Sequence, residues 1–171
     1  RCRALTHYNP IFLNDNGETP MKSKLLLALL TTTLAAGTAV AQVKVEDAIK
    51  FRQSGYGFMA WNMGRIKANV EGTYNKEEVI KAANAIQAIA NSGMGALYVP
   101  GSDKGTGWEA TRAKPAIFTD KEKVGKVAMA FNKEANEMAK IAATGDAAAV
   151  GAQLGKLGDT CKGCHDSFRK K

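Results

Sequence analysis

Two cysteines and a histidine near the end of the sequence form the group of residues best suited to chemistry. Cys161, Cys164 and His165 give the pattern C-x-x-C-H. On a helix the two cysteines lie one turn apart on the same face, so that both sulfurs can reach the two vinyl groups along one edge of a porphyrin. The adjacent imidazole of His165 then points toward the iron as an axial ligand. The pattern is the attachment motif of a c-type haem, and we therefore predict one covalent haem c per chain.

Three other kinds of site fit this motif less well. A structural zinc site needs four ligands, and the other cysteine and histidine, Cys2 and His7, lie in a leader that we expect to be removed. A thioredoxin-like C-x-x-C opens a helix after a strand, whereas this motif lies inside a helical pattern. A disulfide between Cys161 and Cys164 would leave the adjacent histidine without a role.

Residues 21–41 have the composition of a secretory signal peptide. Lys22 and Lys24 precede an apolar run that begins at Leu25, and small residues lead to an A-x-A cleavage site that ends at Ala41. The alternative, a transmembrane helix, needs about 20 apolar residues, and this stretch is shorter. We expect cleavage after Ala41, export to the periplasm and a mature chain of residues 42–171 that is not held in a membrane. Residues 1–20 are expected to be an upstream or artefactual segment.

Apolar residues recur at helical spacing in four segments of the mature chain. The first helix is predicted over about 45–70, and the second begins at Asn75 and fades near Gly93. A capping pair formed by Thr119 and Glu122 opens the third, and Asp146 caps the fourth, which carries the motif. Residues 98–119 are rich in glycine and proline and predict a long loop. We therefore expect an all-α, antiparallel four-helix bundle that encloses a covalently bound haem.

Composition excludes several other classes of protein. The chain has 171 residues, 24 Lys and Arg against 16 Asp and Glu, and 45% hydrophobic residues, which suits one globular domain. The lysines are scattered and form no basic block, so we expect no binding of nucleic acid. The excess of positive charge would suit an acidic redox partner, but a solvated bundle exterior explains it better.

An arginine lies on the otherwise apolar inward face of the first helix. The inward positions are Ile49, Arg52, Tyr56, Met59, Met63, Ile66 and Val70. A buried arginine is rare unless it is paired, and the two haem propionates would be natural partners for Arg52. The alternative is a side chain that extends past the apolar face to solvent.

The sequence does not fix the second axial ligand of the iron, because the mature chain has no histidine besides His165. The remaining side chains are Tyr56, Met59, Met63, Met94, Met129 and Met138. A methionine on an inward face more often fills the core, and a tyrosine ligand needs its pKa lowered from about 10. The site could also have no second protein ligand.

The chain resembles the class II cytochromes c, and most closely the cytochrome c′ family. The resemblance covers residues 42–171 and rests on residues 46–54, 113–118 and 161–169. One departure is Phe118, where the family usually has tryptophan, which bears on local packing only. The resemblance implies a homodimer and a role in binding or tolerating nitric oxide.

The resemblance also implies roles for individual residues. Arg52 and Gln53 would lie by the haem propionates, and Glu109 or Thr111 would touch the haem edge. Arg169, four residues after His165, would lie near the proximal face. The family divides on the residue that the first helix presents to the distal face of the iron. Here that position holds Tyr56, with Met59 one turn further on.

A tyrosine at this position is similar to the five-coordinate, high-spin branch of the family. We therefore expect a distal site without a protein ligand that binds nitric oxide and carbon monoxide, in a protein that also exchanges electrons with an unidentified periplasmic partner. The alternative is a low-spin electron carrier with Met59 as the sixth ligand. We do not expect the protein to be an enzyme, because the mature chain lacks a distal histidine for acid–base catalysis.

Overall fold

The computed structural model describes residues 43–171, and the predicted leader lies outside them. Four long helices account for most of this part of the chain: α2 (Val45–Glu71), α3 (Lys76–Ala90), α5 (Lys121–Thr144) and α6 (Ala147–Phe168). A 3-10 helix, η1 (Met94–Leu97), and a single-turn helix, α4 (Ala116–Thr119), lie between α3 and α5. The described residues contain no strand, and none of their helices combines the length and apolar character that a membrane span requires.

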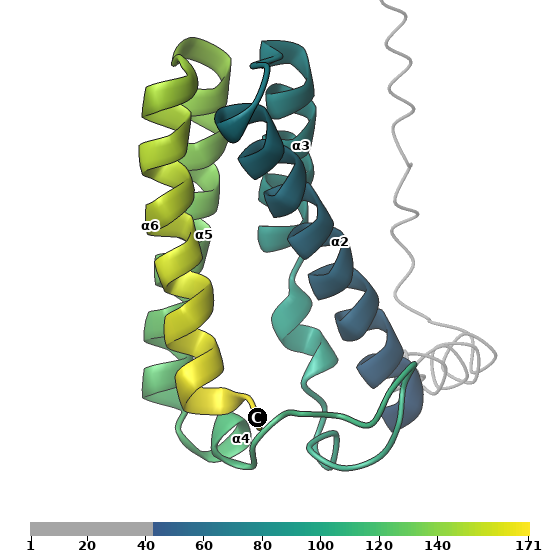
Figure 1. Ribbon diagram of the computed structural model, residues 1–171. Helices are drawn as coiled ribbons and strands as arrows, with labels where there is room; N and C mark the ends of the chain where they lie inside the picture. The colour runs from purple at the N-terminus through teal and green to yellow at the C-terminus, as the bar shows by residue number, and fades with distance from the viewer. Residues whose placement is uncertain (1–42) are drawn as a thin grey trace, which may run out of the picture. The chain divides into compact units, whose positions relative to one another are not determined.

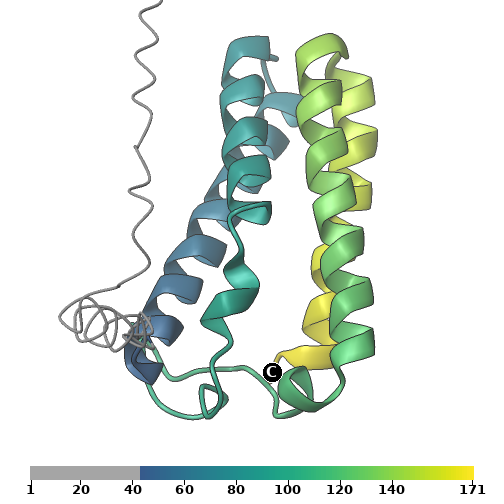
Figure 2. The same cartoon turned by 180° about the vertical axis from the view of Figure 1, so that it is seen from behind.

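The four long helices form an antiparallel bundle, as the sequence predicts. α2 packs against α3 and α5 packs against α6, and the two pairs meet through contacts of α3 with α5 and of α2 with α6. Figures 1 and 2 show α2 crossing close to α6 at one end of the bundle and leaning away from it toward the other. The C-terminus, α4 and the loop before it all lie at this second, more open end.

Polar side chains begin three of the long helices. The side chains of Asn75, Asp120 and Asp146 accept hydrogen bonds from the backbone N–H groups of Glu78, Lys123 and Ala149. Each such cap stabilises a helix by about 1 kcal/mol. The caps at Asn75 and Asp146 were predicted.

The predicted start of the third long helix was wrong by one position. Thr119 is the last residue of α4, and its hydroxyl donates back to the carbonyl of Ala116 at 3.5 Å. The carboxylate of Asp120 therefore takes the capping role, and α5 begins at Lys121. The loop predicted over 98–119 is also shorter than expected, because its last four residues form α4.

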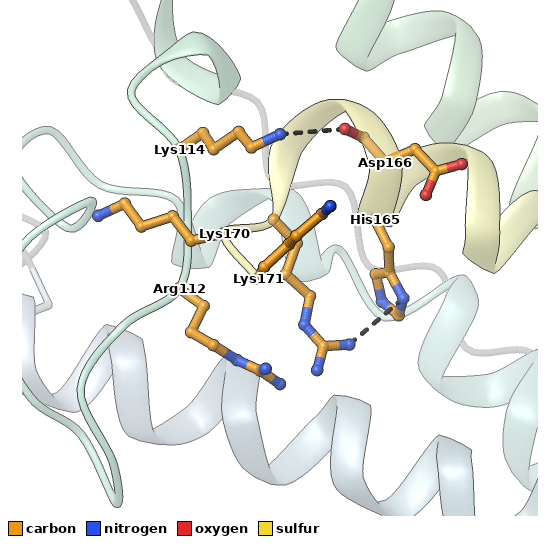
Figure 3. Close-up of a pocket in the computed structure, with 7 residues that line it drawn as sticks. Arg112, Lys114, His165, Asp166, Lys170 and Lys171 are labelled. Carbon is orange, nitrogen blue, oxygen red and sulfur yellow. Dashed lines mark hydrogen bonds between the residues drawn. The ribbon is translucent and has the colours of Figure 1, made fainter.

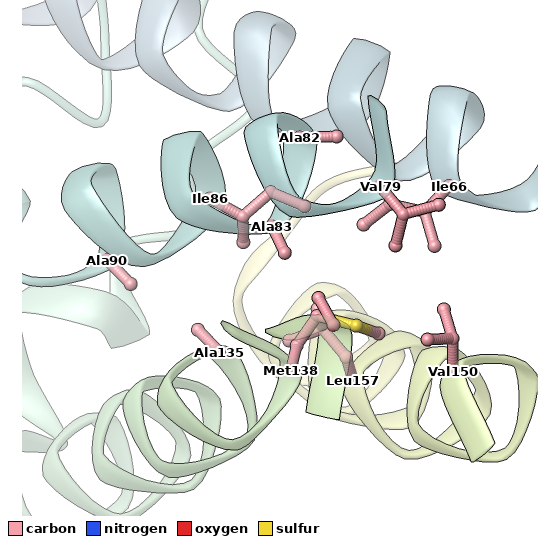
Figure 4. Close-up of a cluster of buried hydrophobic side chains, with 11 residues drawn as sticks. Ile66, Val79, Ala82, Ala83, Ile86, Ala90, Ala135, Met138, Val150 and Leu157 are labelled. Atoms are coloured by element: carbon pink, nitrogen blue, oxygen red, sulfur yellow. The ribbon is translucent and has the colours of Figure 1, made fainter. Parts of the chain in front are cut away.

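One apolar cluster joins all four long helices (Figure 4). It consists of Ile66, Val79, Ala82, Ala83, Ile86, Ala90, Ala135, Met138, Ala142, Val150 and Leu157. Burying a large aliphatic side chain of this kind stabilises the fold by about 1.5–3 kcal/mol. The cluster is built from the C-terminal half of α2, from α3, and from the halves of α5 and α6 that meet at Gly145.

The predicted inward faces are less well covered outside this cluster. On α2, Ile49, Met59 and Ile66 are buried, but Tyr56 is 41% exposed. On α6, Leu157 is fully buried, whereas Cys161 is only half-buried. The bundle therefore has a closed apolar core in one half and partly covered inward faces in the half that carries the cysteine motif.

Candidate functional site

Cys161 and Cys164 lie one turn apart on the last turns of α6. Both thiols are half-buried and neither is in a disulfide. Burial raises the pKa of each thiol, which keeps it neutral and makes a reactive thiolate unfavourable. Between residues 43 and 171 no three His, Cys, Asp or Glu side chains are grouped as a metal site would require. This arrangement fits neither a redox-active cysteine nor a zinc site, and it leaves both sulfurs available for thioether bonds.

His165 follows on the exposed side of α6 and touches Arg169. The Nη1 atom of Arg169 lies 3.3 Å from Nδ1 of His165. The contact engages Nδ1, and Nε2 is the ring nitrogen without a hydrogen-bond partner among residues 43–171. The backbone N–H of Arg169 donates to the carbonyl of His165, and Arg169 also pairs with Ala113 in an isolated β-bridge. The structure thus brings Arg169 and His165 together, as the resemblance implied.

Arg52 is only 4% exposed, so the alternative of a side chain extended to solvent was wrong. Its guanidinium donates to Ser102 Oγ at 2.7 Å, to Thr111 Oγ1 at 2.7 Å and to the carbonyl of Leu97 at 3.2 Å, and also to the carbonyl of Ser102. Burial lowers the pKa of Arg52, and these oxygens compensate for the lost hydration of the charge. The contact with haem propionates stays a prediction, and the role that the geometry shows is to bind the loop to α2.

Gln53 makes a second connection between α2 and the loop. Its Oε1 accepts hydrogen bonds from the backbone N–H of Trp108 at 2.8 Å and of Glu109 at 3.3 Å, and its Nε2 donates to the carbonyl of Glu109 at 2.9 Å. The residues that the resemblance assigned to the haem propionates, Arg52 and Gln53, and to the haem edge, Glu109 and Thr111, therefore do lie together. Glu109 takes part in these contacts through its backbone, and the haem contacts of all four stay predictions.

Two residues that contact Arg52, Ser102 and Tyr98, were not predicted as part of this site. Ser102 is fully buried beneath the guanidinium of Arg52, and the ring of Tyr98 lies 4.8 Å from the centre of the same guanidinium. Both belong to a loop without periodicity, so only the long-range contact with α2 reveals them. An aromatic face beside a buried cation adds an attraction of about 1–2 kcal/mol.

The hydroxyl groups of Tyr56 and Tyr98 lie 3.1 Å apart. Burial raises the pKa of Tyr56, and the neighbouring Tyr98 raises it further. Burial also raises the pKa of Tyr98. Tyr56 is therefore a neutral phenol at physiological pH, which disfavours it as an anionic ligand to iron.

The methionines occupy distinct environments. Met59 is 6% exposed on the inward face of α2, one turn beyond Tyr56. Met138 belongs to the apolar core, and Met129 is 67% exposed. Met59 is thus the one of these three whose position suits a sixth iron ligand.

A cavity of about 650 Å³ opens at this end of the bundle, between the segment 95–103, α4 and the start of α5. Tyr98, Pro115, Ile117, Phe118 and Val124 supply much of its apolar lining. Its volume is in the range of about 300–1,000 Å³ that ligand pockets occupy. Cys161, Cys164 and His165 do not line this cavity. The fit to a covalently bound haem rests on the two neutral thiols, the imidazole and the incompletely covered apolar faces of the helices around them.

Gly107 permits the close approach of the loop to α2. A Cβ atom at this position would lie 2.5 Å from Oε1 of Gln53 and 2.7 Å from the backbone nitrogen of Lys50. We therefore expect Gly107→Ala to push the loop away and to lower the free energy of unfolding by about 1–3 kcal/mol, measured by urea denaturation of the holoprotein. Gly125→Ala is the control, because a Cβ there would meet nothing within 4 Å in α5 and alanine favours a helix. Equal stability of the two variants would contradict the close approach.

Comparison with known proteins agrees with the fold and the site. The family model described as Cytochrome C′ matches residues 47–169. The cytochrome c′ of Rhodocyclus tenuis is 64% identical over 129 residues, which span 75% of this chain and 97% of that protein. That of Allochromatium vinosum is 52% identical over 143 residues, 84% of this chain and 93% of that protein.

Solved structures of such proteins have the same architecture. The crystal structure of cytochrome c′ from Thermochromatium tepidum superposes with a TM-score of 0.73 at 53% identity and covers 77% of this chain and 100% of its own. A cytochrome c′ with an unusual ligand-controlled dimer dissociation gives 0.74 at 54% identity, with the same coverage. The chain belongs to the cytochrome c′ family, whose covalently attached haem c is its cofactor.

Proposed function

We propose that this protein is exported to the periplasm, where its haem binds nitric oxide or carbon monoxide at a distal site without a protein ligand. The haem iron held by His165 supplies the centre for binding a diatomic molecule and for exchanging an electron. The observation that carries the proposal is the tyrosine pair: the hydroxyl of Tyr56, the residue that the resemblance puts at the distal position, lies 3.1 Å from that of Tyr98.

The tyrosine pair favours neutral ligands over charged ones. The raised pKa of Tyr56 keeps its side chain uncharged and bulky, so that it covers the distal position without occupying it as an anion. Met59 and Ile49 on the same face of α2 are apolar and buried. Anions and water entering such surroundings would lose hydrogen bonds, whereas a neutral diatomic molecule would lose little.

We also infer that the protein is not an enzyme. His165 is the only histidine among residues 43–171, and its place beside the two cysteines assigns it to the proximal side. The distal face then has tyrosine side chains but no group that titrates near neutral pH for acid–base catalysis. Electron exchange with a periplasmic partner remains compatible with this set of residues.

The alternative function is a pure electron carrier with Met59 as the sixth ligand. The observation in its favour is the burial of Met59 on the inward face of α2, one turn beyond Tyr56. A thioether ligand would raise the reduction potential of the haem.

The absorption spectrum of the reduced protein separates the two functions. Protein purified from a periplasmic fraction is expected to have the mass of residues 42–171 plus one haem, to show high-spin bands, and to change its spectrum with carbon monoxide. Met59→Ala should leave these bands in place, because Met59 does not ligate iron. Sharp low-spin bands that disappear in Met59→Ala would establish the alternative.

The tyrosine pair can be tested through carbon monoxide affinity. Tyr56→Ala opens the distal position and is expected to raise affinity by about tenfold or more, the equivalent of at least 1.4 kcal/mol. Tyr98→Phe removes only the hydrogen bond that holds Tyr56 and should raise affinity by about fivefold, since such a bond contributes about 1 kcal/mol.

Tyr74→Phe is the matched control for this series. The hydroxyl of Tyr74 is buried without a hydrogen-bond partner among the described residues. Tyr74 lies between α2 and α3 and packs against the apolar cluster, not against the cysteine motif. Carbon monoxide affinity should therefore stay within about twofold of the wild type. An unchanged affinity in Tyr56→Ala would show that Tyr56 does not shield the iron.

We further propose that two copies associate through the outer face of α2. Phe51, Phe58 and Trp61 are between 49% and 59% exposed, and the rings of Phe58 and Trp61 stack with centroids 5.4 Å apart. Contiguous exposed aromatic residues mark interaction surfaces, and a two-fold axis would place this face against itself. A relative at 54% identity has a dimer whose dissociation is ligand-controlled.

Sedimentation equilibrium tests the proposed dimer. Phe58→Lys places a charge in the centre of the aromatic face and should weaken dimerisation by at least about tenfold. Met129→Lys, at a residue on α5 that is 67% exposed, is the control and should leave the dimer intact. A wild-type protein that stays monomeric at micromolar concentration would exclude this interface.

A further inference from the structure

A positively charged pocket of about 300 Å³ lies beside His165 (Figure 3). Its lining residues are Arg112, Lys114, His165, Asp166, Arg169, Lys170 and Lys171. Five of these seven side chains are cationic and one is a carboxylate. We propose that the pocket is a binding site for a small, multiply charged oxyanion of the phosphate class.

Backbone contacts hold the cationic residues together. The backbone N–H of Lys170 donates to the carbonyl of Arg112 at 2.7 Å, and that of Lys114 donates to the carbonyl of Phe168 at 2.8 Å. Ala113 and Arg169 form the bridge between these two hydrogen bonds. Two segments more than 50 residues apart in the sequence are thus fixed side by side, and both contribute cationic residues to one pocket although like charges repel one another.

One side-chain carboxylate, that of Asp166, lines the pocket. The carboxylate of Asp166 forms an ion pair with Lys162, which does not line the pocket. Its negative charge is therefore shared with a cation outside the pocket. The ammonium group of Lys114 donates to the carbonyl of Asp166 at 3.0 Å, so that this lysine has one neutral partner (Figure 3).

Three cationic side chains of the pocket have N–H groups that remain available to bind a ligand. Arg169 uses Nη1 toward His165, and the side chains of Arg112 and Lys171 make no hydrogen bond with any residue in 43–171. Guanidinium groups bind oxyanions through two parallel N–H donors, and an ammonium adds a compact charge. Arg112, Arg169 and Lys171 therefore form the donor set of the proposed site.

The shape of the pocket favours a small anion over an acidic protein surface. Its volume is at the lower end of the range of about 300–1,000 Å³ for small-molecule sites. A single phosphate or pyrophosphate could contact both guanidinium groups at once. An anion bound here would compete with Nδ1 of His165 for the guanidinium of Arg169.

Calorimetric titration of the holoprotein with pyrophosphate at low ionic strength tests the proposal. We expect saturable binding of one pyrophosphate per chain. Arg112→Gln should weaken binding by at least about tenfold, since it removes a pair of charge-assisted hydrogen bonds. The backbone carbonyl of Arg112 that accepts from Lys170 stays in this variant, so the fold is expected to persist, as circular dichroism can check.

Lys76→Gln is the matched control, because it removes the same charge from an exposed position at the start of α3, at the other end of the bundle. Its affinity for pyrophosphate should stay within about twofold of the wild type. Equal weakening in both variants would mean unspecific attraction to a positively charged chain and would overturn the site.

Two further results would also reject the proposal. The first is the absence of saturable heat at millimolar pyrophosphate. The second is binding of an acidic peptide without binding of pyrophosphate, which would assign the pocket to a protein partner. None of these outcomes depends on the coordination of the iron or on gas binding.

Discussion

The buried guanidinium of Arg52 holds together the end of the molecule that carries the site. A charge that is 4% exposed is stable only when oxygens replace the water that it has lost, and the segment 97–111 supplies them from Leu97, Ser102 and Thr111. The irregular loop is thereby fixed to α2, and Gln53 repeats the connection one residue further along. The loop in turn positions Tyr98 against Tyr56, and residues 112–114 against the end of α6.

The two halves of the bundle are stabilised in different ways. Around Ile66, Val79 and Leu157 the helices pack directly through small and aliphatic side chains. Around Cys161 and Cys164 the inward faces are partly covered, and polar contacts from the loop hold the helices in place. The first half gives the fold its rigidity, and the second leaves room for a large flat cofactor.

Features encoded in short stretches of sequence could be predicted, and those that depend on distant contacts could not. The C-x-x-C-H spacing identified the cofactor, helical periodicity gave the bundle, and the cap residues Asn75 and Asp146 marked two helix starts correctly. The third start was wrong because Thr119 and Asp120 are adjacent and both can cap, and only the formation of α4 decides between them. Ser102 and Tyr98 lie in a segment without periodicity, so their contacts with Arg52 could not be read from local pattern.

The uneven distribution of the apolar core bears on how the protein matures. The helices meet tightly around Met138 through their own side chains, so the packing of that half makes no use of the sulfurs of α6. The terminal turns of α6 lie beyond this core, where local opening costs less free energy than global unfolding. Opening of these turns would expose the two thiols for thioether formation while the packing around Met138 is kept.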